Sequence, residues 1–314
     1  MKNFAVVCAD GIGDALITSI AAHTLRKAGH RVTVFSTHLK NFGNLLEEGE
    51  YLPMAQDWGQ ALKTFDAVIL QHEDTPRARE IISFRKQGVS VYVIYTNYRT
   101  SKHGPLALGF DYPVDEGKPM VHNVCQAMQA LFGLCANGQN CLPPTLPLTH
   151  RKWDKRVLIH PTSTREDKNW LKKRFLKLSH ALTHLGYDPM FILSPKEREE
   201  WPDAPLFSSL EELATTVYES GFLIGNDSGP AHLASYYKIP HIVICQGRQM
   251  PLWSPGWHPP QIIRPPRWVP NIKGMRLRED KWKHFIPVSR VVHAFLNLAV
   301  SDKGQKWEIL GRQI

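Results

Sequence analysis

The sequence predicts an α/β protein with parallel sheets, and three observations support this prediction. Short apolar runs rich in β-branched residues alternate with amphipathic stretches of helical period along the 314 residues. A polar, proline-rich segment at 138–155 interrupts the alternation, which then restarts with the run Arg-Val-Leu-Ile-His. The length suits two domains of about 150 residues better than a single core. We therefore expect two α/β halves, residues 1–150 and residues 151–314, joined by a linker.

Eight runs have the character of strands that are buried on both faces of a parallel sheet. They are short, almost continuously apolar and rich in Val and Ile, because helices cover both faces of such strands. We predict strands at 4–8, 31–36, 66–71, 89–95, 156–160, 189–193, 222–225 and 241–245.

Helical patterns separate these strands. The first helix is expected at 15–28, where Ile17, Ile20 and Leu25 share one stripe and Gly29 follows as a stop signal. The alternation indicates βαβ units with right-handed crossovers. Further helices are expected at 77–87, 121–134, 173–185, 210–220, 230–237 and 288–299.

The composition describes an ordered chain with a basic excess. Hydrophobic residues make up 43% and the formal net charge is +9, which suits an anionic partner such as a phosphorylated substrate, an acidic membrane face or a nucleic acid. A solvated basic surface is the alternative. The five cysteines show no C-x-x-C spacing, which argues against a disulfide framework or zinc site and favours a reducing compartment. Asp10 and Asp14 interrupt the first apolar run too early for a signal peptide.

The first strand ends in a glycine turn formed by Gly11 and Gly13. A dinucleotide fingerprint is disfavoured because Leu16 stands where the third glycine belongs, and no acidic residue follows the second strand. Asp14 lies at a helix N-terminus, where the dipole favours the charged carboxylate, and at the strand edge where ligands bind. It is a candidate general base or a plain N-cap, and Asp10 in the same turn competes for the role.

A hydroxyl-rich loop follows the strand at 156–160. Thr162, Ser163 and Thr164 can bind phosphate oxygens together with loop amides, and Lys168 can supply a positive charge. A solvated turn before a basic helix is the alternative for these residues.

The string Gly-Asn-Asp-Ser-Gly-Pro-Ala-His-Leu-Ala at 225–234 predicts a strand, a tight turn and a helix start. Free amides and the helix dipole make such a start an anion site suited to a diphosphate. We assign Asp227, Ser228, Gly229 and His232 to this site, while a buried core histidine is the alternative for His232.

These motifs resemble glycosyltransferase family 9, which holds the ADP-heptose:lipopolysaccharide heptosyltransferases. The resemblance rests on GDALITS at 13–19, HPTST with DKNW at 160–170, GNDSGPAHLA at 225–234 and PLWSPGW at 251–257. It implies a GT-B fold, with two Rossmann-like α/β/α domains facing across a cleft. Residues 1–150 would bind the acceptor and residues 151–314 the nucleotide sugar. Whether the last helix packs back on the N-terminal domain stays open.

The resemblance also implies roles for single residues. Asp14 matches the family's catalytic base, Lys168 its diphosphate lysine, and Glu197 the acid that holds the ribose. The reaction would be inverting transfer from ADP-heptose without a metal or cofactor. The remaining donor-site matches are the hydroxyls of residues 162–164, Asp227, Ser228, Gly229 and His232.

The expected partners are a nucleotide-sugar donor and an anionic lipopolysaccharide-core acceptor of the lipid A–Kdo type, with no nucleic acid. Basic, aromatic-rich sequence at 264–278 and 281–284 fits that acceptor. The expected location is the cytoplasm, with peripheral attachment to the inner membrane face left open, as is the oligomeric state. The alternatives are a GT-B enzyme with another nucleotide sugar, a non-catalytic nucleotide- or polyanion-binding relative and a nicotinamide enzyme.

Overall fold

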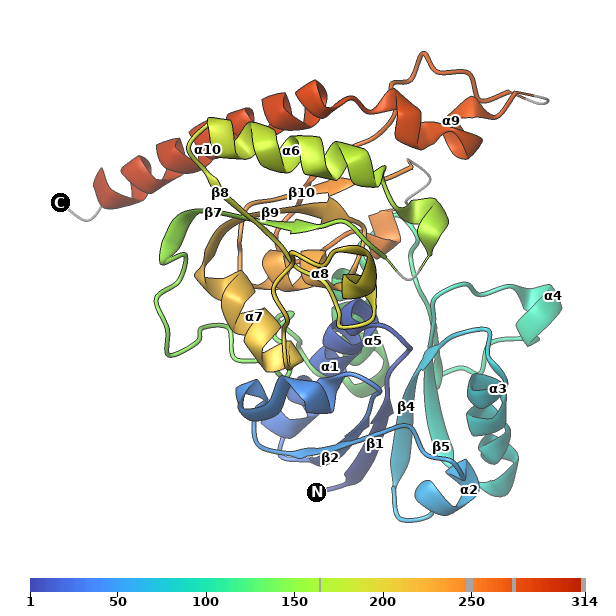
Figure 1. The fold of residues 1–314 in the computed structure, drawn as a ribbon. Helices are drawn as coiled ribbons and strands as arrows, with labels where there is room; N and C mark the ends of the chain where they lie inside the picture. Colours follow the sequence, from blue (N-terminus) through green and yellow to red (C-terminus); the bar gives the residue numbers. More distant parts are fainter. Residues whose placement is uncertain (164, 247–250, 273–274, 312–314) are drawn as a thin grey trace. The chain divides into compact units, whose positions relative to one another are not determined.

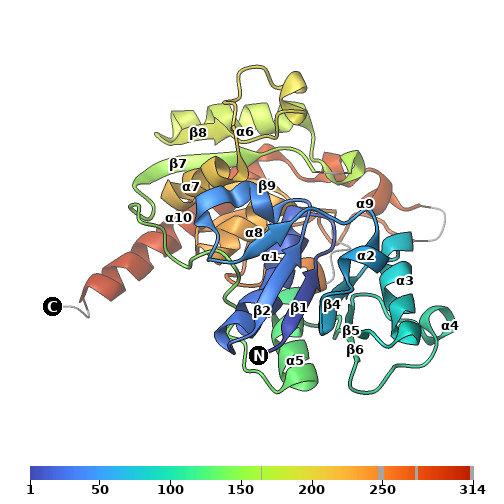
Figure 2. The same cartoon turned by 90° about the horizontal axis from the view of Figure 1, so that it is seen from below.

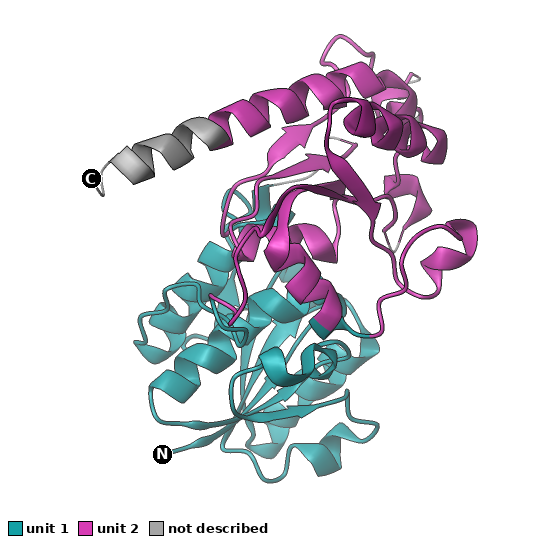
Figure 3. Ribbon diagram, turned by 60° about the vertical axis from the view of Figure 1, so that its left-hand side comes forward, with its two compact units in different colours: residues 1–144, 209–211, 250–256 teal, residues 145–208, 212–249, 257–314 magenta. Residues whose placement is uncertain are grey.

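The computed structural model describes residues 1–163, 165–246, 251–272 and 275–311, without the side chains of residues 280 and 303–311. The chain forms two compact units, coloured separately in Figure 3. The main segment of unit 1 ends at Pro144, shortly before the boundary expected from the sequence. Unit 1 comprises Met1–Pro144, Ser209–Glu211 and Met250–Gly256, and unit 2 comprises Thr145–Ser208, Glu212–Gln249 and Trp257–Ile314.

Unit 1 contains a six-stranded parallel sheet in the order β3-β2-β1-β4-β5-β6. This is the strand order of a Rossmann fold, with the topological switch between β1 and β4. The four predicted strands are confirmed, whereas β3 and β6 were missed because three residues with polar neighbours carry no apolar run. The strands are β1 (Asn3–Val7), β2 (Arg31–Phe35), β3 (Glu50–Leu52), β4 (Ala67–His72), β5 (Ser90–Tyr95) and β6 (Asp111–Pro113).

Helices cover both faces of this sheet, with α1 and α5 on one side and α2 and α3 on the other (Figure 1). Helix α1 begins earlier than predicted, directly after Gly11, and most of its residues are buried. The α-helices of unit 1 are α1 (Ile12–Lys27), α2 (Trp58–Ala61), α3 (Pro76–Ser83), α4 (Thr100–His103) and α5 (Met120–Phe132), and the 3-10 helices are η1 (Leu39–Leu45), η2 (Phe84–Gln87) and η5 (Pro251–Trp253).

Unit 2 contains a five-stranded parallel sheet in the order β11-β10-β9-β7-β8. Strand β9 lies at its centre and is buried at every residue. The four predicted strands are confirmed, but β11 was missed because it is short and has prolines on both sides. The strands are β7 (Trp153–His160), β8 (Asp188–Phe191), β9 (Ser220–Asn226), β10 (His241–Ile244) and β11 (Gln261–Ile263).

The last helix of unit 2 is longer than predicted and packs against α6. The prediction stopped at residue 299 because the apolar stripe gives way to polar sequence there. None of the helices within the described ranges is both long and apolar enough to span a membrane. The α-helices are α6 (Lys172–His184), α7 (Leu210–Glu219, whose first turn belongs to unit 1), α8 (Gly229–Tyr236), α9 (Leu277–Asp280) and α10 (Val288–Gly311), and the 3-10 helices are η3 (Glu166–Lys168), η4 (Glu197–Glu200) and η6 (Trp282–Phe285).

The predicted linker is anchored at both ends. Cys141 is buried and its N–H lies 3.4 Å from the Ser19 hydroxyl on α1, within unit 1. In unit 2, the Arg151 guanidinium forms a bidentate ion pair with the Asp302 carboxylate of α10, with N–O distances of 2.7 and 2.8 Å. Each end of the segment is therefore attached to its own unit.

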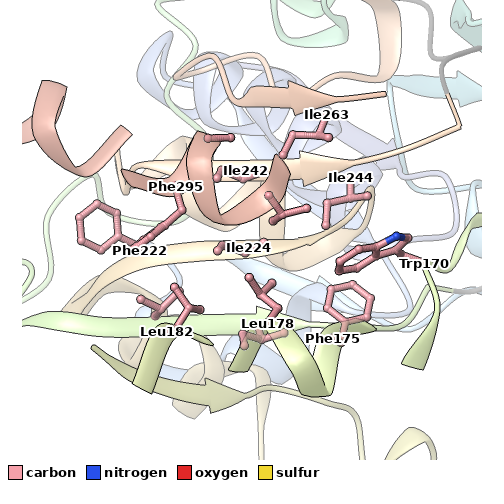
Figure 4. Packing of buried hydrophobic residues seen from close by; sticks show 14 of the residues in the cluster. Trp170, Phe175, Leu178, Leu182, Phe222, Ile224, Ile242, Ile244, Ile263 and Phe295 are labelled. Carbon is pink, nitrogen blue, oxygen red and sulfur yellow. The ribbon is translucent and has the colours of Figure 1, made fainter. Parts of the chain in front are cut away.

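The core of unit 2 lies between its sheet and the pair α6 and α10 (Figure 4). Phe295 of α10 is fully buried, and its ring contacts those of Phe222 at 5.1 Å and Tyr187 at 4.7 Å edge to face. Such aromatic pairs add to the free energy gained by burying apolar area.

We expect Phe295→Ala to lower the free energy of unfolding by about 3–5 kcal/mol, because it leaves a cavity against the sheet. The matched control is Leu296→Ala on the same helix, where 37% of the side chain is exposed and the expected loss is only about 1 kcal/mol. Urea unfolding followed by circular dichroism measures both. Equal losses in the two variants would contradict this packing of α10.

Candidate functional site

The predicted site residues lie at the carboxyl ends of the strands in both sheets, which is where open α/β sheets bind ligands. Asp14 and the glycine turn belong to unit 1, and the two phosphate motifs belong to unit 2. Each unit is described in turn.

In unit 1, the glycine turn places the Asp14 carboxylate over the start of α1. Gly11 has φ 129°, and a β-carbon there would lie 2.8 Å from Asp14 Oδ2. Only glycine combines this backbone conformation with that close approach. Gly13 is buried in the first turn of the helix.

Asp14 is oriented by two residues that sequence reasoning missed. Gln71, buried at the end of β4, donates from Nε2 to Asp14 Oδ1 at 2.8 Å. The Thr18 hydroxyl contacts the Gln71 side-chain oxygen and donates to the Asp14 backbone carbonyl at 2.9 Å. A half-buried carboxylate fixed in this way has the geometry of a positioned proton acceptor.

The competing residue Asp10 has a different environment. Its carboxylate is mostly exposed and lies 3.3 Å from the Arg77 guanidinium, with a further hydrogen bond from the Thr37 hydroxyl at 3.2 Å. Because the Arg77 guanidinium already forms an ion pair with this carboxylate, Asp10 is the weaker candidate for taking a proton.

A third group in unit 1 was not foreseen. Potential metal-ligating atoms of His72, Asp74 and His103 lie within 4.8 Å of one another. However, Lys102 Nζ lies 2.8 Å from Asp74, and His103 Nδ1 accepts the Arg99 N–H at 3.0 Å. That bond leaves the proton on His103 Nε2, which faces Asp74 at 3.4 Å. The group is therefore best described as an ion-pair and hydrogen-bond network.

In unit 2, the hydroxyl-rich loop after β7 is held in place by Asn226, another residue that sequence reasoning missed. The fully buried Asn226 amide donates to the Pro161 carbonyl at 2.7 Å and accepts the Trp170 N–H at 3.0 Å. One side chain thus fixes both ends of the loop. Thr162 and Ser163 lie on this loop, and Thr164 falls outside the described residues.

The structure brings Lys168 and Asp227 together. Lys168 ends the 3-10 turn η3, and its Nζ lies 3.7 Å from Asp227 Oδ2, just before α8. The Lys168 side chain is 42% exposed, so its ammonium group can reach a ligand while Asp227 keeps it in place.

The first turn of α8 is not capped by a side chain. Ser228 occupies the N-cap position, but its hydroxyl contacts His160 Nδ1 at 2.8 Å and the Asn226 carbonyl at 3.2 Å instead. Pro230 in the first turn has no N–H to satisfy. The Ala231 N–H already donates to the Ser228 carbonyl at 3.1 Å, so the helix dipole and the Gly229 N–H are what this start would offer to the anion expected from the sequence.

His232, in the same turn of α8, is 8% exposed. Burial lowers the pKa of His232, and the charge of Asp227 only partly offsets this effect. Within the described ranges of the chain, its buried Nδ1 has no hydrogen-bond partner. An unpaired buried nitrogen is unfavourable, and a ligand oxygen at the start of α8 would satisfy it.

His160 ends β7 and Glu197 begins η4, and the charge of each affects the pKa of the other. Burial lowers the pKa of His160 to about 4, although the Glu197 charge opposes the shift. Burial raises the pKa of Glu197, but hydrogen bonds from the Ser194 N–H at 2.9 Å and hydroxyl at 2.7 Å outweigh it, so the pKa is lowered overall. At neutral pH the histidine is uncharged and the glutamate is ionised.

The family model for glycosyltransferase family 9 (heptosyltransferase) matches residues 91–263, more than half of the chain. The chain belongs to glycosyltransferase family 9. The match includes both motifs of unit 2, while Asp14 and the glycine turn lie outside it. No curated protein sequence matches the chain.

Solved structures share the architecture of this family 9 glycosyltransferase at low sequence identity. ADP-heptose lipopolysaccharide heptosyltransferase II of E. coli has a TM-score of 0.67 and 16% identity, and the alignment covers 96% of this chain and 100% of that one. A glycosyltransferase family 9 structure from Veillonella parvula gives 0.69 and 17%, covering 96% and 98%. The E. coli heptosyltransferase WaaC with ADP gives 0.64 and 15%, covering 94% and 99%. The fold is therefore GT-B, with two Rossmann-like domains.

A pH-dependent stability follows from the buried His160 of this glycosyltransferase. Its pKa falls from about 6.5 when unfolded to about 4 when folded, so the unfolded chain binds more protons between these values. Stability should therefore fall as the pH is lowered from 6.5 towards 4. We expect His160→Gln, which can keep a hydrogen bond to Ser228, to lose less stability between pH 7 and pH 5 than the wild type.

Urea unfolding at a series of pH values measures this slope. His180→Gln, an exposed histidine on α6, serves as the control and should follow the wild type. A wild-type slope in His160→Gln would show that His160 is protonated in the folded protein.

Proposed function

We propose that this glycosyltransferase moves a heptose from ADP-heptose to a lipopolysaccharide-core acceptor, with inversion and without a metal. The observation that supports the proposal is in unit 2, where Lys168 Nζ lies 3.7 Å from Asp227 Oδ2, just before the start of α8, which no side chain caps. Two of the similar structures are an ADP-heptose lipopolysaccharide heptosyltransferase and a heptosyltransferase with ADP.

The diphosphate of the donor would rest on the start of α8. Backbone amides and the helix dipole attract the phosphate oxygens, and Lys168 adds a full positive charge. The hydroxyls of Thr162 and Ser163 lie on the loop that Asn226 fixes nearby, and Thr164 is assigned to the same role from its sequence position. Together these groups stabilise the charge that develops on the departing ADP, which is the role of a metal in other transferases.

Glu197 would accept hydrogen bonds from the ribose hydroxyls of the donor. Its pKa is lowered by the hydrogen bonds from Ser194, despite burial, so it is ionised and acts only as an acceptor at neutral pH. A carboxylate already fixed by the Ser194 N–H can accept from a ribose hydroxyl without reorganising.

Asp14 would act as the general base. It takes the proton from an acceptor hydroxyl while that oxygen forms a bond to the anomeric carbon. The bond from this carbon to the ADP oxygen breaks on the opposite face, and its electron pair leaves with ADP. Gln71 donates to Asp14 Oδ1 at 2.8 Å and so fixes the orientation of the carboxylate that would take the proton.

The acceptor is proposed to be an anionic, phosphorylated lipid core, in keeping with the net charge of +9. An acceptor of this kind would place the enzyme in the cytoplasm at the inner face of the membrane.

Calorimetry with ADP-, UDP- and GDP-sugars tests the donor, and tight binding of ADP-heptose alone is the expected result.

Asp14→Asn tests the base. We expect transfer to fall by about 10²–10⁴, because Asn cannot take a proton, while ADP-heptose affinity is unchanged. The substitution keeps an oxygen for the Gln71 hydrogen bond, so the fold should be retained. The control is Asp10→Asn, which should retain transfer within a few-fold. If Asp10→Asn is inactive and Asp14→Asn is active, Asp10 is the base.

Lys168→Ala tests the diphosphate site. We expect ADP affinity to fall roughly tenfold, the lower end for a hydrogen bond to a charged group, because Lys168 is partly exposed to screening solvent. Lys173→Ala, an exposed lysine on α6, is the matched control and should bind ADP normally.

In the transfer assay used for Asp14→Asn, wild-type activity should continue in EDTA, because Lys168 and the dipole of α8 would supply the positive charge. Loss of transfer in EDTA that added Mg²⁺ restores would contradict the metal-free mechanism.

A further inference from the structure

The segment 264–286, which we call the basic loop, joins β11 to α10 in unit 2 and contains α9 and η6. Figure 1 shows α9 at the outer edge of unit 2, beyond the N-terminal end of α6, and Figure 2 shows the same elements from below. None of the donor-site residues assigned above lies on this segment.

Large apolar side chains of the basic loop face solvent. Trp268 is 75% exposed, Ile272 67% and Met275 48%. Ile272 and Met275 are paired by backbone hydrogen bonds of 3.2 and 3.0 Å in an antiparallel bridge. The bridge fixes the two residues relative to each other. Apolar groups gathered on one short exposed segment indicate an interaction surface.

The same segment is strongly basic. It carries seven Lys and Arg residues against two acidic ones, which accounts for more than half of the chain's net charge of +9. Arg267, Arg276 and Lys281 are exposed. A tryptophan and aliphatic side chains surrounded by cations match the composition of surfaces that insert among anionic lipid headgroups.

Hydrogen bonds hold the described residues of the basic loop. Arg278 donates to the backbone carbonyls of Val269 at 3.1 Å and Arg267 at 3.0 Å. At its base, Trp282 is 1% exposed and donates from Nε1 to the Asp167 carbonyl at 3.0 Å. Among the described residues of this segment, hydrogen bonds therefore fix the backbone around Trp268 and Trp282.

We propose that the basic loop docks this enzyme on a membrane surface rich in anionic lipid, with Trp268, Ile272 and Met275 in the headgroup layer. Charge complementarity selects this occupant: the cations meet lipid phosphates, and the apolar side chains have a place in the bilayer that a nucleic acid backbone does not offer. The inference deepens the proposed function, since a lipid-linked acceptor would lie in that surface.

Sedimentation with vesicles tests the surface. The wild type should bind vesicles of phosphatidylcholine and phosphatidylglycerol, and bind those of phosphatidylcholine alone far more weakly. Each basic residue near an anionic surface contributes roughly fivefold to partitioning, so Arg267→Glu with Lys281→Glu should weaken binding at least about tenfold. Trp268→Ser with Ile272→Ser should weaken it similarly, because the inserted apolar area is lost.

Two matched controls accompany these variants. Leu206→Ser removes an apolar side chain that is 60% exposed on the same unit, near acidic residues, and Lys177→Glu reverses an exposed charge on α6. Both should bind anionic vesicles like the wild type. Wild-type binding by the basic-loop variants would overturn the proposal, as would a dimer of the wild type that these variants convert to a monomer.

ADP calorimetry on the same variants separates this inference from the proposed function. Normal ADP affinity with lost vesicle binding supports a docking surface distinct from the donor site. If the wild type binds vesicles through the basic loop but neither binds nor consumes ADP-heptose, the proposed function fails and the docking surface stands.

Discussion

The loop after β7 in unit 2 depends on the buried side chain of Asn226. It lies at the carboxyl end of the central strand β9, and its amide joins the Pro161 carbonyl to the Trp170 N–H. Because a buried amide must satisfy its hydrogen bonds, the two ends of the loop are fixed relative to the strand. The same strand leads directly into the start of α8. The loop hydroxyls, Lys168 and the helix amides therefore take their positions from one buried residue.

The electrostatics of this site follow from which groups are buried. The nearby histidines, His160 and His232, have lowered pKa values because burial disfavours their charged forms. They serve as neutral hydrogen-bonding groups, so positive charge for an anion comes from Lys168 and the helix dipole. Lys168 is exposed enough to avoid a large desolvation penalty and is kept near the site by Asp227. The diphosphate proposed for this site would therefore meet an exposed cation rather than a buried one.

The sequence was sufficient to predict the parallel α/β architecture and the eight longer strands, because strands buried on both faces are continuous apolar runs. It could not predict β3, β6 or β11, whose three-residue length leaves no periodic signal. Gln71, His160 and Asn226 were also missed. His160 and Asn226 end their strands and Gln71 is the second-last residue of β4, and the sequence alone cannot distinguish a polar residue that orients a site from one that merely ends a strand. Their hydrogen-bond partners lie far away in sequence, so only the fold identifies them.

The base of the basic loop is hydrogen-bonded to the turn that carries Lys168, the residue proposed to bind the diphosphate. Trp282 donates to the Asp167 carbonyl and Lys283 Nζ to the Glu166 carbonyl at 2.9 Å, so both bond to the 3-10 turn that ends at Lys168. The basic loop is therefore bonded directly to the turn that carries Lys168, so restricting the motion of the loop also restricts the turn. If lipid headgroups hold the basic loop, they also restrict this turn. An enzyme whose acceptor lies in the membrane would then have its donor lysine best ordered at the surface where the acceptor is found.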